Sequence, residues 1–403
     1  MRILHTSDWH LGQHFMGKTR LDEHKAFLRW LVEQVKEHEV AAVLVAGDVF
    51  DTGTPPSYAR ELYNGFIVEL QQTGAQLVIL GGNHDSVAML NESRRLLGCL
   101  NVQVIPGMLD DADHQVLVLS DRDGQPGAVL CAVPFIRARE VMASEAGQSA
   151  ADKQQALQQA IADHYQQLFE RAEQQRQQLG LPLPIIATGH LTTVGASSSD
   201  SVREIYIGTL DAFPASAFPP ADYIALGHIH RPQKVGGHEH IRYCGSPIPL
   251  SFDEVGQQKE VLLVEVSGEG LQTVTPLPVP TFQTLARVGG NLEELAVAMK
   301  AVAADHEVPV WLEVTVSEDD YLSDLQPRVE QLAEGLPLEI LLVRRQRAQN
   351  GNGLTAEQGV TLSELTPVEV FERRLAPEPL EAERQQALSE LYRQLLVQME
   401  EEA

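Results

Sequence analysis

The sequence predicts an α/β protein that carries a second, smaller α/β unit and a helical tail. In the first 275 or so residues, short apolar runs alternate with stretches of helical periodicity, which is typical of domains built on parallel strands. A shorter alternation of the same kind follows a proline-rich stretch at residues 276–281. Several apolar runs end in aspartate, asparagine or histidine, which predicts a cluster of ionisable groups at the strand ends.

Eight apolar runs are expected to form the strands of the first unit. They cover residues 2–8, 41–48, 76–82, 102–107, 128–135, 183–190, 222–228 and 259–266. Three segments between them, at 20–38, 57–74 and 152–180, space their apolar residues as one face of a helix. The last two end at Gly74 and Gly180, which suit helix C-termini. We expect this unit to span residues 1–275.

The second unit is expected at residues 281–347, with strands at 284–289, 309–316 and 338–346 and helices at 292–305 and 322–335. A polar linker rich in glycine and asparagine follows at 348–362, and C-terminal helices occupy 363–403. The last helix places Leu388, Leu391, Leu395 and Met399 along one stripe. This stripe could fold back on its own domain or dock on a partner.

The composition is that of a globular protein with 403 residues, of which 43 % are hydrophobic. Its three cysteines are scattered, which fits a reducing cytosol better than a disulfide framework or a thiolate zinc site. No apolar run has the length of a membrane span, and Met1 leads directly into the first strand, so we expect a cytoplasmic protein. The net charge of −26 argues against nucleic acid as a partner, because DNA binders neutralise phosphates with Lys and Arg.

Five of the predicted strands end in side chains that bind metals in other proteins. In chain order these are Asp8 and His10, Asp48, Asn83 and His84, His190, and His228 and His230. If the strands share one carboxyl edge, as in open α/β sheets, these residues converge. Asp8 and His10 are two apart, so an extended segment would point both to the same side.

Seven of these residues form a set of oxygen and imidazole ligands without sulfur: Asp8, His10, Asp48, Asn83, His190, His228 and His230. Seven ligands suit two ions that share a carboxylate, and the ligand types suit manganese, iron or zinc. Two such ions roughly 3.5–4 Å apart can clamp a phosphoryl group during in-line displacement. Each motif alone could be a turn or an edge strand, but five of them together indicate a dinuclear site.

The other histidines are expected to have structural or surface positions. His5 lies inside the first strand and should be a satisfied core histidine, and His14 lies in the loop after the first motif. A solvated surface position is expected for the remainder, which are His24, His38, His114, His164, His238, His240 and His306.

The ordered set DWH, GDVFD, GNHD, TGH and GHIH resembles the calcineurin-like metallophosphoesterase superfamily over residues 4 to about 250. The wider chain resembles the SbcD family of bacterial double-strand-break repair nuclease subunits. That narrower resemblance rests on HTSDWHLG, GDVFDTGTPPSYA, GGNHDS, YIALGHIHRPQ and YCGSPIPLSFDE. It implies a four-layer α/β sandwich with a small C-terminal α/β cap and a helical tail.

The resemblance also implies a role for each site residue. Asp48 would bridge two metal ions, with Asp8, His10 and His230 completing one site and Asn83, His190 and His228 the other. His84 would act on the leaving oxygen as general acid. Asp85 could orient His84 or could cap the helix that begins near Val87, and Asp51 has the same ambiguity.

The implied activity is hydrolysis of DNA, with Mn²⁺ as the metal. The family combines 3′-to-5′ exonuclease action on duplex ends with endonuclease action on hairpins and protein-blocked ends, in DNA repair, recombination and replication. It pairs this subunit with SbcC, a coiled-coil ATPase, through C-terminal helices, and it dimerises through helices near the first two ligand loops. The corresponding segments here are residues 57–70 and 86–100.

Two other functions remain open from the sequence: a small-molecule or cyclic-nucleotide phosphodiesterase or phosphatase, and a scaffold that keeps its metals for structure. The phosphatase pattern has an arginine soon after the GNH box, whereas here the first is Arg94. A scaffold would not need His84. The negative charge could be offset at the metal centre, by a basic partner, or by two arginine clusters, Arg137 with Arg139 and Arg344 with Arg345 and Arg347.

Overall fold

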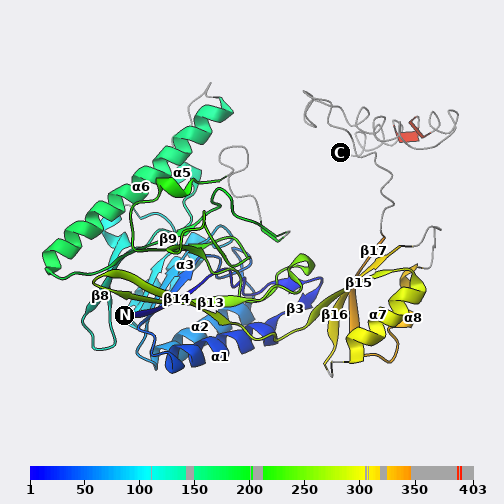
Figure 1. The fold of residues 1–403 in the computed structure, drawn as a ribbon. Helices are drawn as coiled ribbons and strands as arrows, with labels where there is room; N and C mark the ends of the chain where they lie inside the picture. The colour runs from blue at the N-terminus through cyan, green and yellow to red at the C-terminus, as the bar shows by residue number, and fades with distance from the viewer. Residues whose placement is uncertain are drawn as a thin grey trace.

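The computed structural model describes residues 1–109, 111–141, 149–199, 201–202, 212–304, 306, 308–317, 325–345, 388–389 and 391–392. Two six-stranded sheets form the first domain, and a three-stranded sheet forms a separate cap (Figure 1). The predicted linker at 348–362 and nearly all of the tail at 363–403 lie outside these residues, so the expectations for them stay predictions.

The first sheet has the order β14-β13-β1-β4-β5-β6. Its parallel strands are β1 (Arg2–Thr6), β4 (Ala42–Ala46), β5 (Gln76–Leu80) and β6 (Val102–Ile105). The hairpin of β13 (Glu260–Ser267) and β14 (Gly270–Pro278) joins antiparallel to β1. Helices α1 (Leu21–Glu37), α2 (Ser57–Gln71), α3 (Val87–Glu92) and α4 (Arg94–Gly98) follow the parallel strands.

The second sheet has the order β11-β12-β10-β9-β8-β7. It contains β7 (Val116–Ser120), β8 (Pro126–Cys131), β9 (Ile185–His190), β10 (Tyr223–Gly227), β11 (Gln233–Lys234) and β12 (Ile241–Tyr243). The short helix α5 (Ala138–Val141) precedes the long helix α6 (Ala150–Leu179). That helix stops at Gly180, whose φ of 64° is the left-handed conformation that ends many helices.

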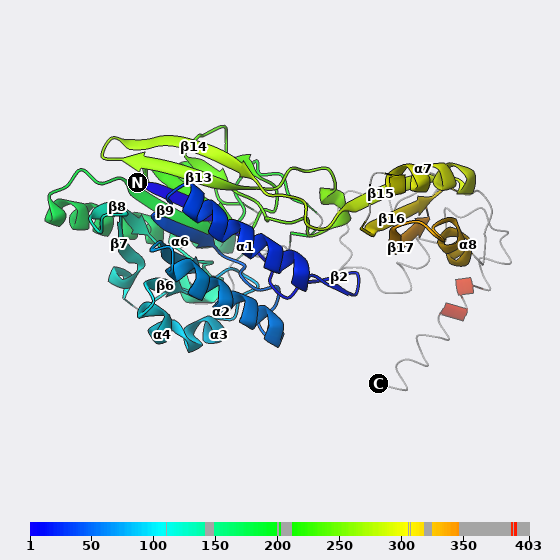
Figure 2. The same cartoon turned by 90° about the horizontal axis from the view of Figure 1, so that it is seen from below.

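The two sheets pack face to face, and each is covered by helices on its outer face (Figures 1 and 2). Residues of both sheets, such as Leu44 and Ile186, share the central core. The outer face of the first sheet packs against α1 and α2, and that of the second packs against α6. This arrangement confirms the expected four-layer α/β sandwich.

Two expectations about histidines are wrong. His24 on α1 and His164 on α6 are buried, although both were expected on the surface. Each lies on the apolar face of its helix, where Phe27 and Leu31 on α1 and Ile161 and Leu168 on α6 are also buried. No helix in the described part of the chain is both long enough and apolar enough to cross a membrane.

The cap is a parallel sheet of three strands, β15 (Leu285–Gly290), β16 (Val310–Val316) and β17 (Leu338–Arg345). Helices α7 (Leu292–Ala304) and α8 (Leu325–Leu332) pack against it around Leu295, Met299 and Val329. All three strands and both helices coincide with predicted segments. The boundaries at 281 and 347 remain predictions.

An aromatic contact joins the cap to the first domain, and we call it the Phe15 cluster (Phe15, Phe252 and Trp311). Phe15 lies on the β2–β3 hairpin (His14–Phe15 and Lys18–Thr19). Its ring stacks on Trp311 of β16 with centroids 5.7 Å apart and meets Phe252 edge-on at 5.0 Å. An ion pair between Lys18 and Glu339 supports the contact. Figure 2 shows the cap at the end of the first domain where β2 lies.

The histidine of the first strand is a core residue, as expected. His5 is fully buried, with Nδ1 2.9 Å from the Tyr223 hydroxyl and Nε2 3.2 Å from the Leu226 carbonyl oxygen. Burial lowers the pKa of His5 from 6.5 to about 3. Below pH 6.5 the unfolded chain therefore binds a proton that the folded chain does not bind. The contribution of His5 to stability is lost as the pH falls from 6.5 toward 3.

We expect the replacement His5→Gln to flatten the acid side of the stability profile. Between about pH 7 and about pH 5 the wild type should lose about 2 kcal/mol more of its unfolding free energy than the variant. Glutamine can also donate and accept a hydrogen bond, so the variant chiefly removes the titration. Urea unfolding of both proteins at both pH values measures the difference, and equal losses would contradict the expectation.

Candidate metal centre

The loops that follow the strands bend sharply at the predicted ligands. Asp8, His10, Asp48 and His228 all have positive φ, between 47° and 95°. Residues other than glycine rarely adopt this conformation, and it recurs at functional sites where the surroundings enforce it. The first strand ends at Thr6, so the expectation that Asp8 and His10 project from one extended segment is wrong.

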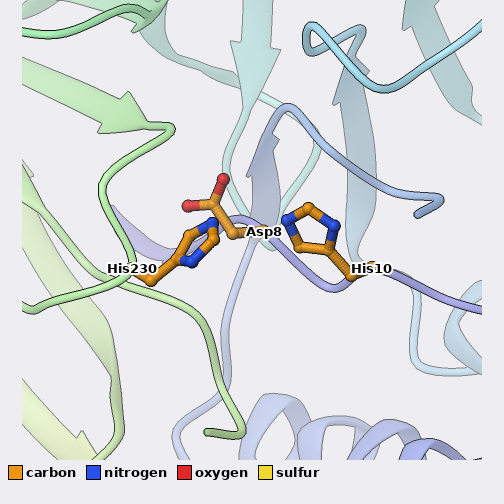
Figure 3. A group of neighbouring side chains, drawn as sticks. All are labelled: Asp8, His10 and His230. Carbon is orange, nitrogen blue, oxygen red and sulfur yellow. The ribbon is translucent and has the colours of Figure 1, made fainter. Parts of the chain in front are cut away.

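Asp8, His10 and His230 form the first group of candidate ligands. One ligand atom from each lies within 4.8 Å of the others, and all three side chains are buried. Figure 3 shows the carboxylate of Asp8 beside both imidazoles. Nδ1 of His10 is 3.1 Å from Oδ1 of Asp51, which directs Nε2 of His10 toward the group. The Asp8 carboxylate accepts the backbone N–H of His228 at 2.9 Å and so connects the loop after β1 to the loop after β10.

Asp48, His190 and His228 form the second group, again with ligand atoms within 4.8 Å of one another. Nε2 of His190 lies 3.2 Å from Oδ2 of Asp48, while its Nδ1 is 2.9 Å from the Ala46 carbonyl oxygen. That carbonyl oxygen accepts a hydrogen bond from a protonated Nδ1, which leaves the Nε2 lone pair for a cation. Asn83 also belongs here, since its Oδ1 lies 2.8 Å from Nε2 of His190 and 3.2 Å from Nδ1 of His228.

Asp48 lies between the two groups. Its Oδ2 is 3.2 Å from Nε2 of His190 in the second group and 3.8 Å from Nε2 of His10 in the first. A third set also has one ligand atom from each residue within 4.8 Å of the others, and it consists of His10, Asp48 and His84. The structure therefore brings all seven predicted ligands together, with one carboxylate within reach of both groups.

Hydrogen-bond partners are missing where a metal would be expected. Within the described residues, three buried atoms of the site have none: Nε2 of His10, Oδ2 of Asp48 and Nε2 of His228. Buried polar atoms without partners are costly in a folded protein. A divalent cation suits nitrogen and oxygen donors of this kind, so the residues fit the two ions that the sequence predicts.

The pKa values reflect a concentration of negative charge. Burial alone would lower the pKa of His190, but the carboxylates of Asp48 and Asp8 raise it to about 9. Against the same effect of burial, Asp51 and Asp48 raise the pKa of His10. Burial and the neighbouring His190 lower the pKa of His228. The carboxylates thus favour positive charge at the site. Protons on the imidazoles can supply this charge, and bound metal ions can supply it in their place.

His84 lies at the edge of the centre and is only half-buried, unlike the other imidazoles. Its backbone N–H donates to Oδ1 of Asp48 at 2.9 Å, and its ring lies 4.7 Å from that of His10 in a perpendicular arrangement. Its Nδ1 is 2.7 Å from the Asp51 carbonyl oxygen, which can only accept. The proton of the neutral ring is therefore on Nδ1.

Asp85 has neither of the contacts expected for it. Its buried carboxylate accepts the backbone N–H groups of Val49, Phe50 and Gly82 at 2.8–3.1 Å. Burial and the charge of Asp48 raise its pKa to about 6. The cap of α3 is Ser86, and the residue that holds His84 is Asp51. Asp85 thus joins the loops after β4 and β5 through their backbones.

Glycines permit the close approach of these loops. A Cβ atom on Gly82 would lie 2.1 Å from Oδ1 of Asp48. On Gly47, whose φ is +93°, it would lie 2.2 Å from Nδ1 of His190. Any larger residue at either position would displace a candidate ligand.

Sequence reasoning missed the polar residues behind His230, of which Glu254 and Lys259 are buried and Ser201 is half-buried. Ser201, Glu254 and Lys259 form a hydrogen-bonded network with that residue. The motif YCGSPIPLSFDE contains Glu254, but no spacing rule relates it to a histidine 24 positions earlier in the chain.

The fold and the site together define a metallophosphoesterase. Residues 1–232 match the family model of the calcineurin-like phosphoesterases, and residues 281–378 match a model described as the type 5 capsule protein repressor C-terminal domain. A dimetal phosphatase from Danio rerio aligns with 69% of this chain and 98% of its own at 12% identity and a TM-score of 0.38, too weak a likeness to support an argument.

Relatives that match most of the chain show which family of phosphoesterases it belongs to. The SbcD subunit of the nuclease SbcCD from Escherichia coli is 56% identical over 393 residues, which cover 97% of each chain. The corresponding protein of Rhodobacter capsulatus is 33% identical, covering 84% of this chain and 86% of its own, and that of Bacillus subtilis is 30% identical, covering 84% and 81%. The chain belongs to the SbcD family of the calcineurin-like phosphoesterases.

Proposed function

We propose that this chain is the nuclease subunit of an SbcCD-type complex and hydrolyses DNA phosphodiester bonds at a two-metal centre. The observation that carries the proposal is the position of Asp48, whose Oδ2 is within 4 Å of an imidazole from each ligand group. Kinship with the SbcD protein of Escherichia coli, at 56% identity, supports DNA as the substrate and an SbcC-like ATPase as the partner.

In this proposal Asp8, His10 and His230 hold one ion, Asn83, His190 and His228 hold the other, and Asp48 bridges them. We assign Mn²⁺ to both positions because mixed imidazole and carboxylate ligands suit it. Two such ions would polarise the phosphodiester and lower the pKa of an attacking water.

His84 is proposed to protonate the leaving oxygen. Asp51 holds Nδ1 through its carbonyl oxygen, so Nε2 is the ring nitrogen that takes up and releases the catalytic proton. The half-exposed position of His84 beside Asp48 suits a group that meets a phosphodiester entering from solvent.

The proposed reactions are 3′-to-5′ removal of nucleotides from duplex ends and endonucleolytic opening of hairpins or blocked ends. They would serve DNA repair, recombination and replication in the cytoplasm, at the nucleoid. In the first of the two arginine clusters expected to contact DNA, one arginine points inward and the other is exposed. Arg137 donates to the Asp85 carbonyl oxygen at 3.1 Å, whereas Arg139 is exposed. In the second, Arg344 pairs with buried Glu313, and Arg347 lies outside the described residues.

Cleavage of a labelled DNA hairpin with Mn²⁺ tests the function. The wild type should cut the hairpin faster than it hydrolyses a cyclic nucleotide or bis(p-nitrophenyl) phosphate, and a chelator should stop the reaction. Turnover of only the small phosphodiesters would keep the metal centre, refute the nuclease assignment, and support the small-molecule phosphodiesterase instead.

The C-terminal helices are proposed to bind the ATPase. Deletion of residues 360–403 should abolish binding of the SbcC-like partner and leave Mn²⁺ binding and basal phosphodiesterase activity in place, because the metal ligands all lie before residue 231. Affinity co-purification with the partner measures the loss. If the shortened chain still retains the partner, the docking segment lies elsewhere.

A homodimer through α2, α3 and α4 is proposed as well. These helices expose two large apolar side chains, Val68 at 54% and Leu96 at 67%. Sedimentation equilibrium at micromolar concentration should give a species near twice 44.3 kDa. The double variant Val68→Lys and Leu96→Lys should shift it toward the monomer, and a wild type that sediments only as monomer would contradict the proposal.

A further inference from the structure

Glu254 is a fully buried carboxylate behind the metal centre, in the short 3-10 helix η3 (Phe252–Glu254). Its Oε2 accepts from the Lys259 ammonium at 2.6 Å and from the Leu250 backbone N–H at 3.0 Å. Its Oε1 accepts from the hydroxyls of Ser199 at 2.7 Å and Ser201 at 2.6 Å. Burial alone would raise the pKa of Glu254, but the imidazole of His230, whose Nδ1 is 3.6 Å from Oε1, and the charge of Lys259 hold that pKa well below its usual range.

The network has a fixed direction. An ionised carboxylate only accepts hydrogen bonds, so the single hydroxyl proton of Ser201 points to Glu254. The Ser201 oxygen is then left to accept, and Nδ1 of His230 lies 2.6 Å from it. Nδ1 of His230 must therefore carry the proton, and its Nε2 presents the lone pair.

The backbone of His230 is held by the same network. The buried Lys259 ammonium donates to the His230 carbonyl oxygen at 2.9 Å and to the Ser246 hydroxyl at 3.0 Å. The ring and the main chain of His230 are thus both fixed by groups that converge on Glu254.

We infer that Glu254 is a positioning residue for the metal centre, which acts through Ser201 to fix the tautomer and orientation of His230 as a ligand. The inference rests on the proposed function for the presence of a metal at His230. Hydrogen bonds of this kind, in which the far N–H of a ligating imidazole donates to a carboxylate, raise ligand basicity and contribute about 10- to 100-fold in metal affinity. Here a serine hydroxyl stands between the carboxylate and the imidazole.

A purely structural role is the competing explanation, because the buried Glu254–Lys259 pair would be costly to break wherever it lay. Ser199 and Ser201 separate the two explanations. Both donate to the same Glu254 oxygen, but only Ser201 contacts His230. Neither substitution removes the ion pair.

The test is Mn²⁺ titration of the metal-free full-length chain by calorimetry. Ser201→Ala should weaken one of the two ions by about 10- to 100-fold. Ser199→Ala should bind both as the wild type does, and Ser201→Thr, which keeps the hydroxyl, should restore the affinity. Equal affinities for Ser201→Ala and Ser199→Ala would overturn the inference.

A spectroscopic measurement on the unaltered protein gives a second, independent answer. In the metal-free wild type with a neutral His230 ring, the ¹⁵N shifts of His230, assigned with His230→Gln, should show a protonated Nδ1 and an unprotonated Nε2. The opposite tautomer would overturn the inference even if the serine variants failed to fold. A wild type that binds two Mn²⁺ ions and cuts no DNA would refute the nuclease proposal and leave this test unaffected.

Discussion

Replacement of His84 by glutamine should reduce cleavage of a DNA hairpin by about 10²- to 10⁴-fold, the usual contribution of a general acid. Glutamine retains a side-chain donor near the Asp51 carbonyl oxygen, which now holds Nδ1 of His84 at 2.7 Å, but it cannot deliver a proton. Because none of the seven proposed ligands changes, the variant should still bind two Mn²⁺ ions with the wild-type affinity. Single-turnover cleavage and calorimetry measure the two quantities.

The matched control is His114→Gln, which changes a histidine whose side chain is 69% exposed. This variant should cut at the wild-type rate. Loss of bound metal in His84→Gln together with loss of activity would mean that His84 is itself a ligand. The distances within the set of His10, Asp48 and His84 allow for that outcome. Full activity in His84→Gln would exclude it as the acid.

Replacement of Asp48 by asparagine should have the larger effect, because one substitution alters both groups of ligands. The amide keeps an oxygen that can accept the His84 backbone N–H, but it removes the charge that faces His10 and His190. We expect both Mn²⁺ affinities to fall by more than about 100-fold, beyond the effect of losing an outer hydrogen bond. Cleavage should fall below detection.

Asp51→Asn provides the contrast. The Asp51 carboxylate contacts His10 at 3.1 Å, so its neutralisation should weaken the ion at His10 and leave the other unchanged. Calorimetry that found a single weakened ion in Asp48→Asn, with the other unchanged, would show that Asp48 does not bridge.

The strands and the ligand set could be predicted because their signals are local. All eight predicted runs of the first domain overlap a strand, and the residues at or just beyond the ends of five of them meet at one place. The strands β7, β12 and β14 were not predicted. Shared carboxyl ends of parallel strands explain the convergence within each sheet, for β1, β4 and β5 in the first and for β9 and β10 in the second. The two sets meet because the sheets pack face to face, which the strand pattern alone did not predict. The helix predicted at 152–180 and observed at Ala150–Leu179 is another local signal, set by apolar spacing and a terminal glycine.

What escaped prediction depends on contacts between distant segments. His24 and Asp85 are buried by neighbouring loops and helices, and their residue types gave no sign of it. Ser201 and Glu254 are 53 residues apart in the chain, so no local signal relates them. The left-handed turns at Asp8 and His10 likewise depend on a distant contact, the bond of the Asp8 N–H to the Gly47 carbonyl oxygen in the next strand's loop.

The Phe15 cluster connects the cap to both loops that carry or hold ligands of the metal centre. The β2–β3 hairpin starts four residues after His10, and Phe252 is two residues before Glu254. Both aromatic rings pack in one cluster with Trp311 of the cap. A rotation of the cap must therefore either break the stack or carry the hairpin and η3 with it. In the second case, a movement of the cap displaces two segments. One is the hairpin, which follows His10, and the other is η3, which contacts His230 through Ser201.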